Sequence, residues 1–231
     1  MVSICMAVKN GAQFIREQID SILPQLGEQD ELIISDDHST DASIDIIRSY
    51  RDPRIQLHFN SHSGIISNFE NCLHFSRGEY IFLCDQDDVW HPEKVTSMLA
   101  YLKEYDLIVS DCFITNEQGN QPVSFFKINR SGGGLARNLM RNSYMGCCMA
   151  FRKDVLQKAL PFPNQIPMHD LWIGLIAERY FRVHFIPEQL VYHRRHNKNA
   201  STTTGSSSNG LVQKLGFRYQ LIKNLIQLQY A

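Results

Sequence analysis

Three carboxylates stand together directly after a short apolar run of the sequence. Asp85, Asp87 and Asp88 follow residues 80–84, a run that is typical of a strand buried on both faces. Like charges this close repel each other, and a divalent cation is the simplest way to keep all of them ionised. A hard cation held by a few carboxylates completes its shell with water and substrate phosphates. The cluster therefore predicts a metal and diphosphate site.

A second acidic pair follows another apolar run. Asp36 and Asp37 come directly after residues 31–34, and the polar residues 39–41 follow them. Ligands of open, mostly parallel sheets bind beyond the carboxyl ends of the strands, so two acidic strand ends indicate one shared crevice. Two alternatives remain open. Acidic turns often serve only their own backbone, and carboxylates at this place also cap the helix that follows.

Strands and helices alternate in the half of the chain that positions these acids. This alternation predicts right-handed crossovers and a mostly parallel central sheet flanked by helices, which is an α/β fold. The expected strands are 2–8, 31–35, 55–59 and 80–84, and the expected helices are about 14–23, 42–50 and 65–75.

The pattern changes after Pro92. A helix to about Lys103 and a strand at 107–110 continue the alternation, whereas residues 113–126 read as short strands and turns. We therefore expect a mixed second half. Its further elements are expected to be helices at 135–141 and 170–180 and strands at 145–151, 183–186 and 190–192.

The C-terminal part separates into two segments. Residues 197–210 are nearly all Asn, Ser, Thr, Gly and Lys, a composition that predicts a flexible linker. Residues 211–231 place apolar side chains on one face of an expected amphipathic helix. Such a helix either docks on the preceding domain or lies on a membrane surface, and both interpretations fit the pattern.

Composition narrows the class of protein. The chain has 231 residues, 43% of them hydrophobic and 20% charged, which predicts one large soluble domain. A formal net charge of -1 argues against a nucleic-acid binder that works by neutralising phosphates. The six cysteines form no metal-type pairs and read as reduced thiols. Neither a signal peptide nor a run of about 20 apolar residues is seen, so we expect a cytoplasmic protein.

Several ordered motifs together resemble one known family. Residues 34–41, 85–92 and 192–199 are similar to those of bacterial family 2 glycosyltransferases with the GT-A fold, and the similarity covers about residues 2–200. The run Asp-Gln-Asp-Asp, hydrophobic residue, Trp at 85–90 is most similar to the rhamnosyltransferase-like branch of surface polysaccharide synthesis. The same branch shares the segments found here at 146–147 and 169–172.

The resemblance implies a domain organisation and a donor pocket. It implies a GT-A domain over residues 1–196, with a Rossmann-like, nucleotide-sugar-binding half at 1–112 and an acceptor half at 113–196. Asp85 would contact the ribose or donor sugar, and Asp88 would support the metal shell or meet the sugar. The residues that would line the nucleotide pocket are Ala7, Val8, Asp36 and Asp37.

The resemblance also implies a metal site and a diphosphate clamp. Asp87 would bind the metal directly and His196 would be a further ligand, a donor set that suits Mg²⁺ or Mn²⁺. Arg194 or Arg195 would hold the diphosphate, although a lone basic run is more often a solvated face. The metal would take up the charge that develops on the departing nucleoside diphosphate.

Asp170 is the candidate general base. An acceptor hydroxyl is a poor nucleophile until a positioned base removes its proton, and the resemblance places Asp170 in that role. Its neighbours Leu171 and Trp172 would raise its pKa by desolvation, whereas the start of a helix would lower it; the alternative is a simple helix cap. One base without a covalent nucleophile predicts inversion at the anomeric carbon, by analogy with inverting glycosidases.

The sequence therefore predicts an inverting, metal-dependent, non-processive glycosyltransferase. Its donor would be a nucleoside diphosphate sugar of the dTDP-rhamnose or UDP-hexose type. Its acceptor would be lipid-linked or an oligosaccharide, on the cytoplasmic face of the membrane, in O-antigen, capsule or lipopolysaccharide synthesis. One alternative is a nucleotidyltransferase, but residues 8–11 lack the Gly-rich basic loop that a triphosphate requires. Another is an inactive sugar-binding scaffold, which would not need Asp170.

Overall fold

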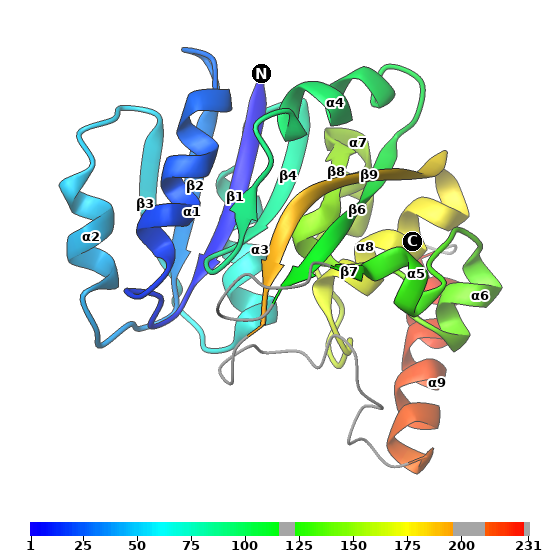
Figure 1. The fold of residues 1–231 in the computed structure, drawn as a ribbon. Helices are drawn as coiled ribbons and strands as arrows, with labels where there is room; N and C mark the ends of the chain where they lie inside the picture. The colour runs from blue at the N-terminus through cyan, green and yellow to red at the C-terminus, as the bar shows by residue number, and fades with distance from the viewer. Residues whose placement is uncertain (116–122, 196–210, 229–231) are drawn as a thin grey trace.

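The computed structural model describes residues 1–115, 123–195 and 211–228, and one mixed sheet organises them (Figure 1). Its hydrogen-bonded strand order is β3-β2-β1-β4-β8-β6-β9-β5, with β7 paired to β6, and helices flank it. The predicted linker 197–210 lies outside the described residues, as does His196. In the ranges that the structure covers, no helix combines the length and apolar character needed to cross a bilayer.

The N-terminal half is the parallel half of the sheet. Neighbouring strands align so that Ala7 pairs with both Ser35 and Asp85, and Val8 pairs with Asp36. The acidic ends of the strands therefore meet at one edge of the sheet. The elements of this half are β1 (Val2–Val8), α1 (Ile15–Ile22), a 3₁₀ turn η1 (Leu23–Gln25), β2 (Glu31–Asp36), α2 (Ser43–Ser49), β3 (Ile55–Phe59), α3 (Ile65–Phe75) and β4 (Tyr80–Asp85).

The second half is mixed, as predicted. Strand β8 runs antiparallel to both β4 and β6, and the long strand β9 is parallel to β6 and antiparallel to β5. The elements are β5 (Val89–Trp90), α4 (Lys94–Tyr101), β6 (Leu107–Thr115), β7 (Val123–Ser124), α5 (Phe125–Asn129), α6 (Leu135–Met140), η2 (Gly146–Cys148), β8 (Met149–Arg152), α7 (Lys153–Ala159), α8 (His169–Tyr180), β9 (Val183–Arg194) and α9 (Leu211–Gln227).

Two expectations for this half were wrong, and one helix was missed. The strand expected at 145–151 begins as the 3₁₀ turn η2, where the buried Lys94 ammonium donates to the carbonyl of Cys147, and only then becomes β8. The strands expected at 183–186 and 190–192 are one strand, β9, whose pairing with β6 is irregular around Asp111. Helix α7 was not predicted at all.

The core lies between the sheet and its helices. Strand β2 is buried along its whole length, and residues 81–84 of β4 are also buried, because helices cover the sheet on either side. Trp172 of α8 is fully buried and its indole N–H donates to the carbonyl of Ala159 at 2.9 Å. Helix α8 is therefore fixed against α7, which matters for the site because α8 begins at His169.

Candidate active site

A cavity of about 230 Å³ lies at the carboxyl ends of β1 and β4. It is lined by residues from the parallel half and from the start of α8, two parts of the chain that are far apart in the sequence. Six of the residues singled out in the sequence contribute to its wall: Ala7, Val8, Asp37, Asp85, Asp87 and Asp170.

Asp37 is the carboxylate at the end of β2 that faces this cavity. Its Oδ2 accepts from the Lys9 ammonium at 2.8 Å and from the Gly64 amide at 3.1 Å, and its Oδ1 accepts from the Asn60 amide at 3.3 Å. Burial disfavours the charged form, but these hydrogen bonds outweigh it and lower the pKa of Asp37. Asp37 is therefore held as a fixed negative charge.

Asp36 has a different role from its neighbour. Its side chain is buried and does not line the cavity, and its Oδ2 accepts from the backbone amide of Ser39 at 2.9 Å. His38, which lies just before Ser39 in this turn, adopts a left-handed backbone with φ 59° and so closes the turn. The structure thus gives the pair two roles, one in the turn and one at the cavity.

The acidic turn after β4 is joined to the loop after β1. The amide side chain of Gln86 accepts from the backbone N–H of Lys9 at 2.9 Å and donates to its carbonyl at 3.0 Å. Asp85 and Asp87 on either side of it line the cavity. Burial, followed by the negative charges of Asp88 and Asp87, holds the pKa of Asp85 well above its usual range. Several carboxylate oxygens on one wall of a cavity fit a hard divalent cation.

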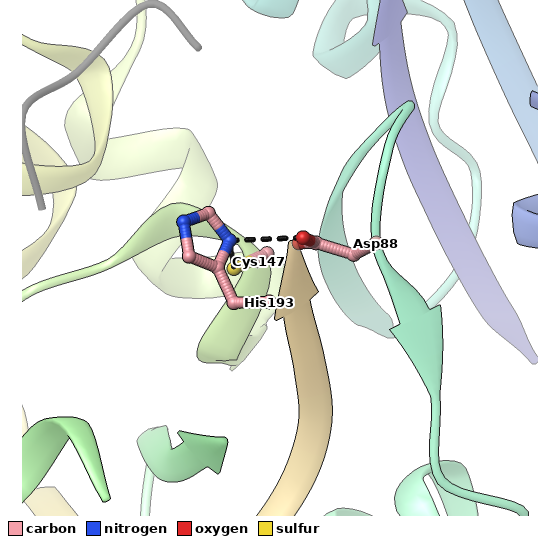
Figure 2. A group of neighbouring side chains, drawn as sticks. All are labelled: Asp88, Cys147 and His193. Atoms are coloured by element: carbon pink, nitrogen blue, oxygen red, sulfur yellow. Dashed lines mark hydrogen bonds and ion pairs between the residues drawn. The ribbon is translucent and has the colours of Figure 1, made fainter. Parts of the chain in front are cut away.

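Asp88 turns away from the cavity and forms a buried ion pair. Figure 2 shows its carboxylate pointing toward His193 from β9, with Cys147 from η2 beside them. Oδ1 of Asp88 lies 2.9 Å from Nδ1 of His193 and also accepts from the Arg194 amide at 3.2 Å. Burial opposes both charges, but their attraction wins: it raises the pKa of His193 to about 9 and lowers that of Asp88.

The side chains of Asp88, Cys147 and His193 are close enough to share a metal ion, since their ligand atoms lie within 4.8 Å of one another. Their protonation argues for the ion pair instead. Hydrogen bonding with Cys148 and burial hold the pKa of the Cys147 thiol well above its usual range, and the raised pKa of His193 favours its protonated form beside Asp88. The cavity carboxylates are therefore the better cation site.

The basic run at the end of β9 is divided between different environments. Arg194 donates to Glu17 at 2.8 Å and lies 4.9 Å from the ring centre of Phe14, so it is directed toward α1. Arg195 is described but does not line the cavity. His193, which was not singled out, does line it. The available signal was the two-residue period of a strand, which places His193 on the same face as the apolar Val191; both are buried in β9.

Asp170 lies in the first turn of α8 and faces the cavity. Its Oδ2 accepts from the Gly146 amide at 3.1 Å, and its Oδ1 accepts from the Leu171 amide at 2.6 Å. Burial outweighs these hydrogen bonds and raises the pKa of Asp170 to about 6. A carboxylate with that pKa, beside a cluster of acids that fits a cation, is suited to accept a proton near neutral pH.

His169 is a further cavity residue that sequence reasoning did not assign. It is stacked on Phe69 with ring centres 3.9 Å apart, and it is 2% exposed. Burial lowers its pKa to about 3, so the ring is neutral. Neither ring nitrogen has a hydrogen-bond partner among the described residues. Gly146 lies against it, since a Cβ there would be 3.3 Å from Nε2.

Comparison with solved structures identifies the class of the fold. A fragment of TarS from S. aureus in complex with UDP-GlcNAc has a TM-score of 0.73 at 18% identity, covering 98% of this chain and 66% of that one. Glucosyl-3-phosphoglycerate synthase from Mycobacterium tuberculosis, in complex with Mn²⁺ and UDP, has a TM-score of 0.61 at 19% identity, covering 99% and 79%. The fold is that of the GT-A glycosyltransferases.

The family follows from the sequence match. The model of Glycosyl transferase family 2 matches residues 3–160, and the chain belongs to this family. The putative teichuronic acid biosynthesis glycosyltransferase TuaG of Bacillus subtilis is 25% identical over 231 residues, which covers 97% of this chain and 89% of TuaG. An uncharacterized glycosyltransferase of Rickettsia felis is 27% identical over 215 residues, or 87% of this chain. This chain spans about a third of the length of the Rickettsia felis and Rickettsia conorii relatives.

Proposed function

We propose that the chain is an inverting, metal-dependent glycosyltransferase that moves one sugar from a nucleoside diphosphate sugar to an acceptor hydroxyl. The observation that carries the proposal is the single cavity that brings Asp37, Asp85 and Asp87 together with Asp170. The first three come from the ends of parallel strands and the fourth from α8. Such a site combines an acidic cation site with a separate proton acceptor, the two groups that this displacement requires.

Asp87, with Asp85 beside it, would hold Mg²⁺ or Mn²⁺. When bound, the ion supplies Lewis-acid stabilisation of the negative charge on the departing nucleoside diphosphate. Asp37 would receive the nucleotide, with Ala7 and Val8 forming the adjoining wall. The mannosyltransferase PcManGT from Pyrobaculum calidifontis, which shares the fold at TM-score 0.67 and 16% identity, was solved with GDP-Man and Mn²⁺ and supports this assignment. The donor would be of the UDP-hexose or dTDP-rhamnose type.

Asp170 would accept the proton of the acceptor hydroxyl. Its two backbone hydrogen bonds orient the carboxylate, and burial keeps its pKa near the pH at which it would act. Because Asp170 is assigned as a base and no cavity carboxylate is assigned as a covalent nucleophile, we propose direct attack by the acceptor and inversion of the anomeric centre.

The acceptor would be lipid-linked or an oligosaccharide of a bacterial surface polymer, such as O-antigen, capsule or lipopolysaccharide. The match to TuaG, named for teichuronic acid biosynthesis, supports the surface-polymer context. The six cysteines of the chain are buried free thiols, as expected of a protein that works in the reducing cytoplasm.

The test is donor turnover by the purified chain. Nucleoside diphosphate release is measured for a panel of UDP-, dTDP- and GDP-sugars with Mg²⁺ or Mn²⁺, and with a chelator. We expect release only with metal, loss of release in Asp87→Ala, and normal release in the exposed control Asp45→Ala. The anomeric configuration of the product is then read by NMR, and retention contradicts the mechanism.

The same assay separates the two alternatives. Release of pyrophosphate from a nucleoside triphosphate and a sugar phosphate would identify a nucleotidyltransferase. Donor binding without turnover, unchanged by Asp170→Asn, would identify a sugar-binding scaffold.

A further inference from the structure

The near-neutral net charge hides a strong separation of charge along the chain. Residues 118–153 contain six Lys and Arg residues and no Asp or Glu, and residues 189–231 again contain six and none. All 24 acidic residues therefore lie elsewhere, and four of them line the cavity. A chain with a net charge of -1 thus has a strongly basic part, which includes α5, α6 and α9.

These three helices lie together in the fold (Figure 1). The Arg218 guanidinium of α9 donates to the carbonyls of Leu139 at 3.2 Å and Met140 at 2.8 Å, which fixes α9 at the end of α6. Arg141, directly after α6, donates to the Asn129 side chain of α5 at 3.3 Å. We call this region the α5–α6–α9 surface, and the basic residues described on it are Lys127, Arg130, Arg137, Arg141, Arg218 and Lys223.

Helix α9 has two apolar faces, and only one of them is covered. Leu221 and Leu225 are 2% and 3% exposed, so they dock the helix on the domain. A second set follows the spacing i, i+4, i+7, i+11, which places its members on one face of the helix. That set is Leu215 (53% exposed), Tyr219 (64%), Ile222 (44%) and Ile226 (48%).

The neighbouring helices also carry exposed apolar side chains. Met140 at the end of α6 is 66% exposed, and Ile128 of α5 is 41% exposed. Because Arg218 binds the carbonyl of Met140, the end of α6 lies next to α9. Exposed apolar side chains and basic side chains without acidic neighbours in sequence therefore occupy the same three helices.

We propose that the α5–α6–α9 surface docks the protein on an anionic lipid bilayer, with the exposed face of α9 in the interface. Aliphatic and aromatic side chains enter the boundary between headgroups and acyl chains, and Lys and Arg bind anionic headgroups. Lys223 is suited to both, since its apolar stem can lie along the bilayer while the ammonium reaches a phosphate. This inference goes beyond the transfer reaction and does not depend on it.

Charge favours this partner over two others. Two copies of the chain that met through this surface would bring like charges together, so self-association is disfavoured. Nucleic acid would match the charge but not the aliphatic side chains of α9, since its binding rests on phosphate contacts and base stacking. An anionic bilayer satisfies both the charge and the apolar area.

The experiment is sedimentation of the full chain with vesicles. We expect binding to vesicles of phosphatidylglycerol and phosphatidylethanolamine, at least tenfold weaker binding to phosphatidylcholine, and weakening by salt, because the Debye length falls from about 10 Å at 0.1 M to about 3 Å at 1 M. The double variants Tyr219→Gln/Ile222→Gln and Arg141→Glu/Lys223→Glu should each bind at least tenfold more weakly. Phe59→Gln, an equally exposed aromatic position on β3, should bind as the wild type does.

Three results would overturn the inference: equal binding to both vesicle types, binding that the α9 variants do not weaken, or no binding at all. Two further results would assign the face to another partner. A dimer in sedimentation velocity would assign it to a second copy if Tyr219→Gln/Ile222→Gln dissociates that dimer. Oligonucleotide binding would assign it to nucleic acid if Arg141→Glu/Lys223→Glu abolishes that binding.

Circular dichroism checks that each variant is folded. Nucleoside diphosphate release in the same preparations separates this inference from the proposed function, since either can fail while the other stands.

Discussion

Asp88 and His193 are 105 residues apart in the sequence, yet their side chains form a buried ion pair with 2.9 Å between Oδ1 and Nδ1. Removing one partner leaves an uncompensated charge in the interior. We expect His193→Ala to lower the free energy of unfolding by about 3–5 kcal/mol, measured by urea denaturation. The exposed pair of Glu79 and Arg152 is the control, and Glu79→Gln should change stability by less than about 1 kcal/mol. A similar small loss in His193→Ala would contradict the pair's structural role.

Asp170 should set the pH dependence of transfer. Burial raises its pKa to about 6, and a general base works only when it is deprotonated. The value of kcat/KM should therefore fall tenfold for each unit of pH below about 6 and level off above it. Asp170→Asn should reduce kcat by about 10²–10⁴ and remove that acidic limb.

The matched control for this prediction is Asp154→Asn, an exposed aspartate in the first turn of α7. It should keep both the rate and the pH profile of the wild type. An acidic limb that survives in Asp170→Asn would show that another group titrates, and Asp170 would then lose its assigned role.

Metal and nucleotide should stabilise the fold together. A ligand that binds the folded state alone adds about 2.7 kcal/mol at a hundredfold excess over its Kd, so UDP with Mn²⁺ should raise Tm in a thermal-shift experiment. The increase should require both components and should vanish in Asp87→Ala but not in Asp45→Ala. Stabilisation by UDP that is the same with a chelator present would speak against a bridging cation.

Two glycine substitutions should separate activity from stability. A Cβ at Gly146 would lie 3.3 Å from Nε2 of His169 and in ordinary contact with Oδ2 of Asp170 at 3.9 Å, so Gly146→Ala should shift His169 beside the base by a few tenths of an ångström. We expect about a tenfold loss of kcat/KM, with a change in unfolding free energy below about 1 kcal/mol.

Gly174→Ala is the opposite case. Its Cβ would lie 2.4 Å from the ring of the buried Tyr144, and overpacking of this kind costs about 1–3 kcal/mol or more. It should therefore lower Tm clearly in a calorimetric scan. If Gly146→Ala proves equally destabilising, its loss of activity would no longer report on the site.

The parallel half was predictable because its signals are local. Strands β1 and β3 have the predicted bounds, since β1 is a mostly apolar run, β3 alternates apolar and polar residues, and turn residues bound both. The grouping of Asp37, Asp85 and Asp87 in one cavity follows from parallel topology, which brings the carboxyl ends of strands to one edge.

The second half depends on contacts that no local pattern encodes. The turn η2 forms where Lys94, more than 50 residues earlier, donates to the Cys147 carbonyl. Pro187 lies inside β9, and the polar residues after it read as a turn, so the single long strand was divided in two. Arg194 pairs with Glu17, 177 residues away, and its direction could not be read from the basic run.

The amide of Gln86 bonds both backbone groups of Lys9, much as a neighbouring strand would. The acidic turn after β4 and the loop after β1 are consequently held together at the edge of the cavity before any donor binds. Selection among donors on this side must then come from shape and charge that already exist.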